Sequence, residues 1–189
     1  MLEKIRMLIE SRSEKMGFQN VLDDIGAPAD GGDLAQYGPL LDSLDAASAN
    51  ALRGLYRQNR SFKFSFEHVM GVKVRFGGAN LFDLRSVLGG LNALPDDFVP
   101  FDRTPDDNMV VVAARSGELT LFYNDSGTDD FAPMQVDLAQ YLRLLDECRG
   151  LLNWQVASMH RAQAISSEAR DAFLEDLRSV FPDADHRLF

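Results

Sequence analysis

The stretch from residue 80 to residue 145 constrains the fold most, because two strand patterns and a helix pattern follow one another there. Residues 109–114 and 118–123 are rich in Val, Leu, Ala and aromatic side chains, and the short turn 115–117 separates them. Two such runs around a glycine-containing turn predict a β-hairpin. Asp137 is the expected N-cap of the helix that follows, whose apolar positions are Leu138, Tyr141, Leu142, Leu145 and Cys148.

Alternating phenylalanines predict another strand earlier in the chain. Phe62, Phe64 and Phe66 are spaced by two, so they fall on one face of a strand over residues 61–66. We expect this face to be buried in the core. The alternative is that the rings stack on nucleic-acid bases, as aromatic strands do in RNA-binding sheets, with Lys63 beside them.

Apolar residues at helical spacing predict two helices in the first sixty residues of the chain. Residues 2–15 carry such a pattern, and Ser43 is the expected N-cap of a helix that ends near Asn59. Between these helices, the glycines and prolines of residues 23–42 predict a loop.

The C-terminal part of the chain is expected to be helical. Ser166 or Ser167 is the expected cap of a last helix, and Pro182 is expected to end it. Trp154 lies on a helical stripe and is expected in the core.

The mixed order of these elements predicts an α+β fold rather than a doubly wound sheet. We expect a central, largely antiparallel sheet flanked by helices, with a C-terminal helical extension. The expected organisation is an N-terminal helix and linker over residues 1–40, an α+β domain over 41–150, and a helical extension over 151–189.

Composition restricts where such a chain works and what it binds. The chain has 189 residues, of which 46% are hydrophobic, so it can bury a normal core. Cys148 is the sole cysteine and cannot form an intramolecular disulfide, which favours a reducing cytoplasm. The net charge of −10 disfavours nucleic-acid and membrane partners, because phosphate backbones and anionic lipids would be repelled.

The charge is unevenly distributed along the chain. Residues 96–137 contain ten acids and two bases, a net charge of −8. Residues 53–85 contain seven bases and two acids, a net charge of +5. Opposed charge blocks of this kind suit electrostatic recognition of a basic partner.

The sequence contains no catalytic signature, and we expect neither a catalytic centre nor a cofactor. The paired glycines lack the context of a phosphate-binding motif. His68, His160 and His186 are far apart in sequence and do not have metal-ligand spacing. Cys148 lies among leucines of a helix, so a buried small side chain is favoured over a nucleophile.

Two acidic segments are the candidates for partner binding. Residues 102–107 are expected to be a charged loop, with a partner-binding edge as the alternative. Residues 125–130 are expected to be a solvated turn, although they have some likeness to a weak cation-binding loop. The predicted partner-binding residues are exposed acids on these loops: Asp102, Asp106, Asp107, Asp125, Asp129 and Asp130.

The order of elements resembles the SUKH superfamily, which includes bacterial immunity proteins against polymorphic toxins and fungal cell-wall synthesis regulators. The resemblance covers roughly residues 40–150. It rests on an order of sequence segments: Leu52–Asn59, the aromatic strand, Leu81–Leu84, the strand Met109–Ala114, the glycine-turn hairpin, the link Phe131–Val136 with its proline, and the helix opening Asp137–Leu142.

The resemblance implies a non-enzymatic protein-binding module that binds and occludes a toxin domain. Many toxin nucleases are basic because their substrate is polyanionic, and an acidic surface can mimic that substrate. The alternatives are a regulatory or scaffold protein without a toxin partner, or an enzyme with an unrecognised site.

Overall fold

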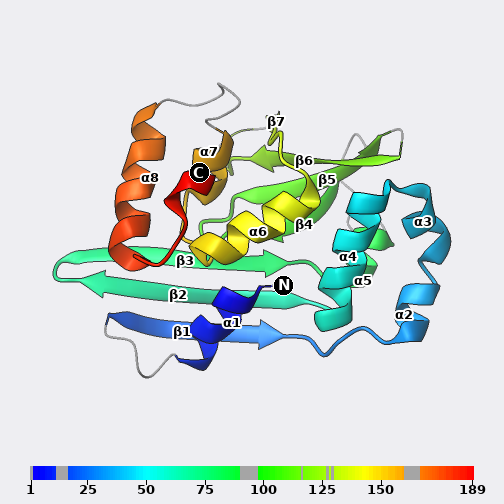
Figure 1. Cartoon of the computed structure of the whole chain (residues 1–189), viewed down its shortest axis with the longest axis horizontal. Helices are drawn as coiled ribbons and strands as arrows, with labels where there is room; N and C mark the ends of the chain where they lie inside the picture. The colour runs from blue at the N-terminus through cyan, green and yellow to red at the C-terminus, as the bar shows by residue number, and fades with distance from the viewer. Residues whose placement is uncertain are drawn as a thin grey trace.

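The strands of the computed structural model form two antiparallel sheets (Figure 1). The structure describes residues 2–11, 17–89, 98–115, 117–126, 128, 130–159 and 167–189. Sheet A has the strand order β1-β2-β3, with β1 Phe18–Ile25, β2 Phe62–Met70 and β3 Lys73–Leu81. Sheet B has the order β4-β5-β6-β7, with β4 Val99–Arg103, β5 Met109–Arg115, β6 Glu118–Asn124 and β7 Phe131–Pro133.

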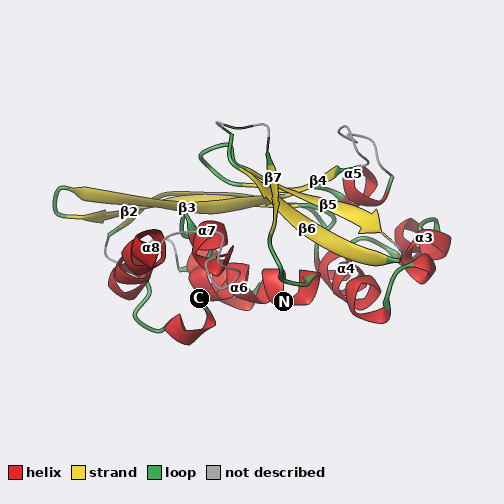
Figure 2. Ribbon diagram, turned by 90° about the horizontal axis from the view of Figure 1, so that it is seen from above, coloured by secondary structure: helices red, strands yellow, loops and turns green. Residues whose placement is uncertain are grey.

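Most of the helices lie together on one side of the strands (Figure 2). Their bounds are α1 Glu3–Glu10, α2 Gly31–Ala35, α3 Gly38–Ser43, α4 Ala46–Gln58, α5 Leu84–Leu88, α6 Leu138–Cys148, α7 Trp154–Met159 and α8 Ser167–Val180, with a short 3-10 helix His186–Leu188. Figure 2 shows α4, α6, α7 and α8 on one side of the strand layer and α5 on the other. The α+β class is confirmed, although the strands divide between two sheets rather than forming one.

The three phenylalanines of β2 share one buried face, as predicted. Phe62, Phe64 and Phe66 are 1%, 2% and 2% exposed. Their partners across the β2–β3 pair are Leu81, Ala79 and Gly77 in that order. A Cβ atom on Gly77 would lie 2.2 Å from Cζ of Phe66, so the ring needs a glycine opposite it. Because the rings are buried, they are not available to stack on bases.

The two sheets meet between β3 and β4, where two hydrogen bonds join them. The Phe82 backbone N–H donates to the Phe101 carbonyl at 2.9 Å, and the Asn80 backbone N–H donates to Oδ1 of Asp102 at 2.9 Å. A side-chain carboxylate thus takes the place of a main-chain acceptor at this joint.

The predicted hairpin and the Asp137 cap are confirmed. β5 and β6 pair in register from Met109 to Arg115, and the Asp137 side chain accepts the Gln140 backbone N–H at 2.7 Å. The prediction that Ser43 caps α4 is wrong. Ser43 ends α3, and Asp45 caps α4 by accepting two backbone N–H groups.

The predicted loop over residues 23–42 is also wrong. β1 extends to Ile25 and pairs with β2, and α2 and α3 follow it. Asp30 begins α2 through reciprocal hydrogen bonds with Asp33, a capping box that uses acids at both positions.

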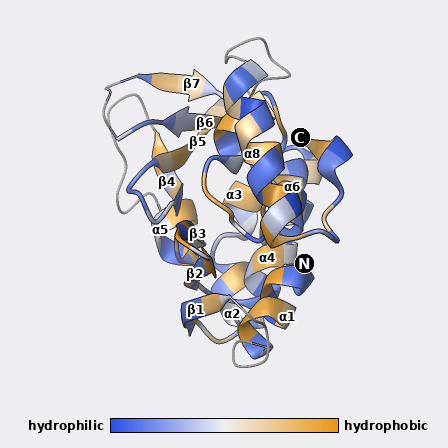
Figure 3. Ribbon diagram, turned by 90° about the vertical axis from the view of Figure 1, so that its left-hand side faces the viewer, coloured by the Kyte–Doolittle hydropathy of each residue, from blue (hydrophilic) through white to orange (hydrophobic). Residues whose placement is uncertain are grey.

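The N-terminal and C-terminal segments pack on the same core as the sheets. Ile5 and Leu8 of α1 belong to this core, as do Phe181 and Phe189 near the C-terminus. Figure 3 shows hydrophilic and hydrophobic positions interleaved along α6 and α8, as expected for helices with one buried face. In the ranges that the structure describes, no helix has the length and apolar character needed to cross a membrane.

Candidate partner-binding site

The two predicted acidic loops lie at the same end of sheet B. The strand register places Arg103, Met109, Asn124 and Phe131 in one row across β4, β5, β6 and β7. The loop after Arg103 and the loop after Asn124 both leave the sheet beyond this row. Neighbouring strands thus bring together acids that are about twenty residues apart in sequence.

Asn108 fixes the two loops to each other. Its Nδ2 donates to Oδ2 of Asp106 at 3.0 Å, and its Oδ1 accepts the Ser126 backbone N–H at 2.9 Å. Thr104 adds a second anchor, because its hydroxyl donates to Oδ1 of Asp106 at 2.5 Å. Asn108 therefore links the two loops, and Asn108 and Thr104 together hold the carboxylate of Asp106.

The pKa of Tyr123 depends on carboxylates from both loops. Burial raises the pKa of its hydroxyl, and the negative charges of Asp106 and Asp125 raise that pKa further. One carboxylate comes from each loop, so both loops contribute to the negative field at this end of the sheet. We call the exposed acids Asp106, Asp107, Asp125 and Asp130 the acidic end of sheet B.

The six predicted residues do not all belong to this surface. Asp106, Asp107, Asp125 and Asp130 are exposed, as predicted. Asp129 lies outside the described residues. The prediction for Asp102 is wrong, because this residue is 0% exposed and lies inside the protein.

Asp102 is buried because β4 contains a β-bulge. The register passes from Pro100 opposite Val111 to Asp102 opposite Val110, so Phe101 is an extra residue in β4. Strict alternation is interrupted at this point, and both Phe101 and Asp102 are fully buried. The sequence carries no signal for the bulge.

The buried carboxylate connects three parts of the fold. Oδ1 of Asp102 accepts the Asn80 N–H of sheet A, and Oδ2 accepts the Tyr141 hydroxyl of α6 at 2.6 Å. Burial raises the pKa of Asp102 to about 6, although these hydrogen bonds oppose the rise. Desolvation disfavours the charged form, whereas donors to the carboxylate favour it.

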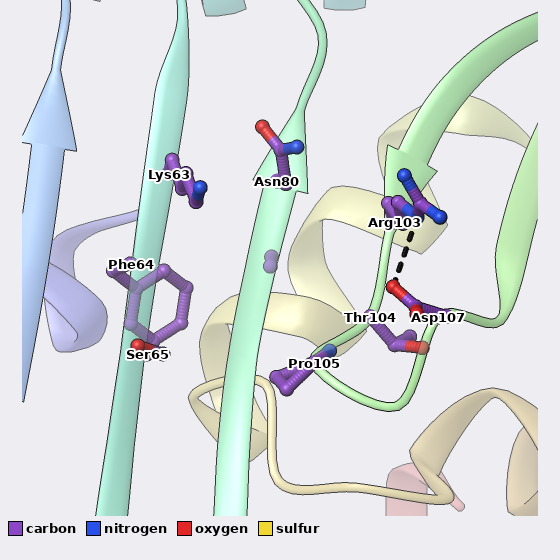
Figure 4. A pocket seen from close by; sticks show the side chains of 9 residues that line it. Lys63, Phe64, Ser65, Asn80, Arg103, Thr104, Pro105 and Asp107 are labelled. Atoms are coloured by element: carbon purple, nitrogen blue, oxygen red, sulfur yellow. Dashed lines mark ion pairs between the residues drawn. The ribbon is translucent and has the colours of Figure 1, made fainter.

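A polar pocket of about 310 Å³ lies beside the acidic end (Figure 4). Its walls come from β2, β3 and the loop after β4, and Figure 4 shows Lys63, Asn80 and Arg103 on successive strands. Asp107 lines the pocket and pairs with Nε of Arg103 at 3.2 Å. No motif in the sequence indicates this pocket, because its residues come from segments that are far apart in the chain.

A second cavity of about 330 Å³ is lined by aliphatic side chains at the other end of sheet B. Val112, Ala114 and Leu119 form its sheet wall, and Leu44 and Leu52 come from the helical side. Among the described residues, its lining has no polar side chain to orient a ligand, and Leu40 at its edge is 40% exposed.

Cys148 is buried, as predicted, and we expect it to be unreactive in the folded protein. Burial raises the pKa of its thiol, and its Sγ contacts the Leu145 carbonyl at 3.6 Å. Because the thiolate is the reactive species, we expect labelling by a thiol-specific disulfide reagent at pH 8 to be about a hundredfold slower than in urea. Absorbance of the released thiol would measure both rates. Similar rates in the two conditions would contradict the burial of this side chain.

The described part of the chain shows no metal-ligand cluster, since no three His, Cys, Asp or Glu side chains gather there in a suitable arrangement. Comparisons with known proteins identify no relative, as no protein-family model, curated protein or solved structure gives a significant match. The resemblance to the SUKH superfamily therefore stays a prediction.

Proposed function

We propose that this protein is a non-enzymatic binding module whose acidic end of sheet B recognises a protein with a basic surface. The observation that carries the proposal is the exposure of four carboxylates on two loops that Asn108 ties together. These acids come from the segment with a net charge of −8.

The physical effect of such a surface is mainly on the rate of association. Clustered like charges attract an oppositely charged partner over roughly one Debye length, about 8 Å at physiological salt. Complementary potentials raise association rates and suppress wrong partners, and they contribute less to affinity itself. The acidic end thus supports rapid capture of a basic partner.

The SUKH resemblance suggests a toxin domain as that partner. A nuclease toxin has a basic surface that binds phosphates, and carboxylates held by tied loops can occupy the same surface. Binding there blocks access of the substrate without any chemistry by the inhibitor. A regulatory or scaffold role without a toxin is the alternative, and the identity of the partner distinguishes the two. Pull-down from the native host followed by mass spectrometry identifies it.

Charge reversal at the acidic end is expected to slow association with the captured partner. The test variant is Asp125→Lys with Asp130→Lys, because both residues are exposed. At low salt we expect the association rate constant to fall about tenfold or more, and the difference to shrink as salt is added. Stopped-flow or surface-plasmon kinetics over a salt series measure this.

A matched control carries the same change in charge at other sites. Glu118→Lys with Glu168→Lys alters two exposed acids, of which Glu118 lies at the opposite end of β6 from Asn124. We expect a much smaller effect on association. Both variants should retain the unfolding free energy within about 0.5 kcal/mol, since surface substitutions usually have small effects. Equal kinetics for the two variants would refute the proposed binding surface.

A further inference from the structure

The polar pocket opens on the side of sheet A that the major helices leave uncovered. Lys63, Ser65 and Asn80 point away from the face that carries Phe62, Phe64 and Phe66, because successive residues of a strand alternate between faces. Figure 2 shows α6, α7 and α8 on the other side of the strand layer. The pocket is therefore reached from outside the protein.

Gly78 leaves the floor of the pocket without a side chain. Gly78 is the register partner of Ser65. A Cβ atom on Gly78 would lie 2.5 Å from the Phe64 carbonyl oxygen and 2.9 Å from Cγ of Pro105. No side chain fits there without a shift of the backbone, so a hollow is left between the strand face and the loop that carries Pro105.

Cationic and amide groups from three successive strands face this hollow. Lys63 comes from β2, Asn80 from β3 and Arg103 from β4, and Figure 4 shows them side by side along the pocket. Among the described residues of the lining, Asp107 is the one acid. It pairs with Nε of Arg103 at 3.2 Å, and among the described residues the two terminal nitrogens of the guanidinium have no acceptor. The lining thus carries a net positive charge in a chain whose net charge is −10.

The backbone positions of Asn80 and Arg103 are held from inside the protein. The buried carboxylate of Asp102 accepts the Asn80 backbone N–H, and Asp102 immediately precedes Arg103 in β4. Asp102 is held in turn by the Tyr141 hydroxyl. Two residues from different sheets are therefore kept next to each other across the joint, which reduces the ordering cost of binding a ligand between them.

We propose that this pocket binds a compact oxyanion, a carboxylate or a phosphate group. An arginine fork and a lysine are the side chains that recognise such groups best, and the Asn80 amide adds neutral donors. A cation would be repelled by Lys63 and Arg103. A volume of about 310 Å³ accommodates a single small group rather than a nucleic-acid strand. The pocket adjoins the proposed basic-partner surface and shares Asp107 with it, but the proposal does not depend on partner binding at that surface.

Two probes distinguish the sources from which such a group would come. Inorganic phosphate represents a free anion, and a blocked tripeptide with a central glutamate represents an acidic side chain of a protein. Each is titrated at constant ionic strength into the isotope-labelled protein, and the backbone amide resonances of residues 63, 80 and 103 are followed by NMR. We expect saturable shifts at these amides with at least one probe.

Variants then test the groups that carry the proposal. Arg103→Ala should weaken binding of the effective probe about tenfold, Arg103→Lys should weaken it less, and Lys63→Ala with Arg103→Ala should abolish saturation. Lys73→Ala and Arg57→Ala remove the same charges at exposed positions outside the pocket and should leave binding within about twofold. The spectra away from the pocket confirm that each variant is folded.

The two titrations identify the source of the anion. Saturation by phosphate alone supports a free anion as the ligand, and saturation by the glutamate peptide supports an acidic side chain of a partner. Absence of saturable shifts with both probes overturns the proposal. Equal weakening by the pocket variants and by their controls also overturns it, because the effect would then reflect net charge alone.

Discussion

Replacing Phe64 by alanine is expected to lower the free energy of unfolding by about 3–5 kcal/mol. The ring is buried between Phe62 and Phe66, with ring centroids 5.7 Å and 6.5 Å away. Its edge also approaches Gly150, where a Cβ atom would lie 3.0 Å from Cζ. Truncation would leave a cavity lined by sheet A and by the segment after α6. Its surroundings therefore have little freedom to collapse into it.

Phe76→Ala is the matched control for this prediction. Phe76 lies on β3 of the same sheet but is 45% exposed on the uncovered side. We expect its loss to cost less than about 1 kcal/mol, because the Phe76 ring buries less apolar surface on folding than the Phe64 ring does. Urea denaturation followed by circular dichroism gives both values. A Phe64 variant that is no less stable than the Phe76 variant would contradict the packing described for β2.

The sequence predicted best those elements whose own pattern matches their burial. The spacing of Phe62, Phe64 and Phe66 was sufficient to identify the inner face of β2, and Asp137 was sufficient to locate the start of α6. In both cases one local rule, strand alternation or helix capping, agrees with the tertiary structure. The burial of Cys148 was predictable for the same reason, since this residue lies on the apolar stripe of α6.

β1 was missed because its pattern is polar. Of its residues, Gln19, Asn20, Asp23 and Asp24 are exposed, and the register with β2 shifts between Gln19 and Leu22. Such an edge strand gains its structure from pairing with β2 rather than from its own propensity. Its single-sequence signal is therefore that of a loop.

The acidic end was predicted in part, because exposure of loop acids follows from composition but their assembly does not. Asp106 and Asp125 come together through the register of β4, β5 and β6, which only the folded sheet defines. Asp102 belongs to the same acidic run, yet the β-bulge turns it into the core. The pocket lined by Lys63 and Arg103 likewise depends on how sheets A and B meet.

The buried carboxylate of Asp102 is expected to make stability depend on pH in an unusual direction. Its pKa is about 6 in the folded protein, against 3.8 when the group is solvated, because burial disfavours the charge. The folded state therefore binds the proton more tightly than the unfolded state. The resulting stabilisation is fully present below pH 3.8 and is lost as the pH rises through about 6.

Asp102→Asn removes this titration while keeping the shape of the side chain. The difference in unfolding free energy, variant minus wild type, should rise by roughly 2–3 kcal/mol between pH 4 and pH 7.5, in favour of the variant. Other titrating groups, including His68, whose pKa burial lowers, are present in both proteins and cancel in the difference. Urea denaturation at a series of pH values measures it.

Tyr141→Phe tests the same assignment from the donor side. The Tyr141 hydroxyl donates to Asp102 and thereby holds the pKa of the carboxylate below the value that burial alone would give. Its removal should raise that pKa and make the loss of stability with rising pH larger than in the wild type. Asp102→Asn combined with Tyr141→Phe should show neither effect, because the titrating group is gone. A variant-to-wild-type difference for Asp102→Asn that stays constant from pH 4 to pH 7.5 would mean that Asp102 does not titrate in this range, and that the joint between the sheets holds its carboxylate as a charge without penalty.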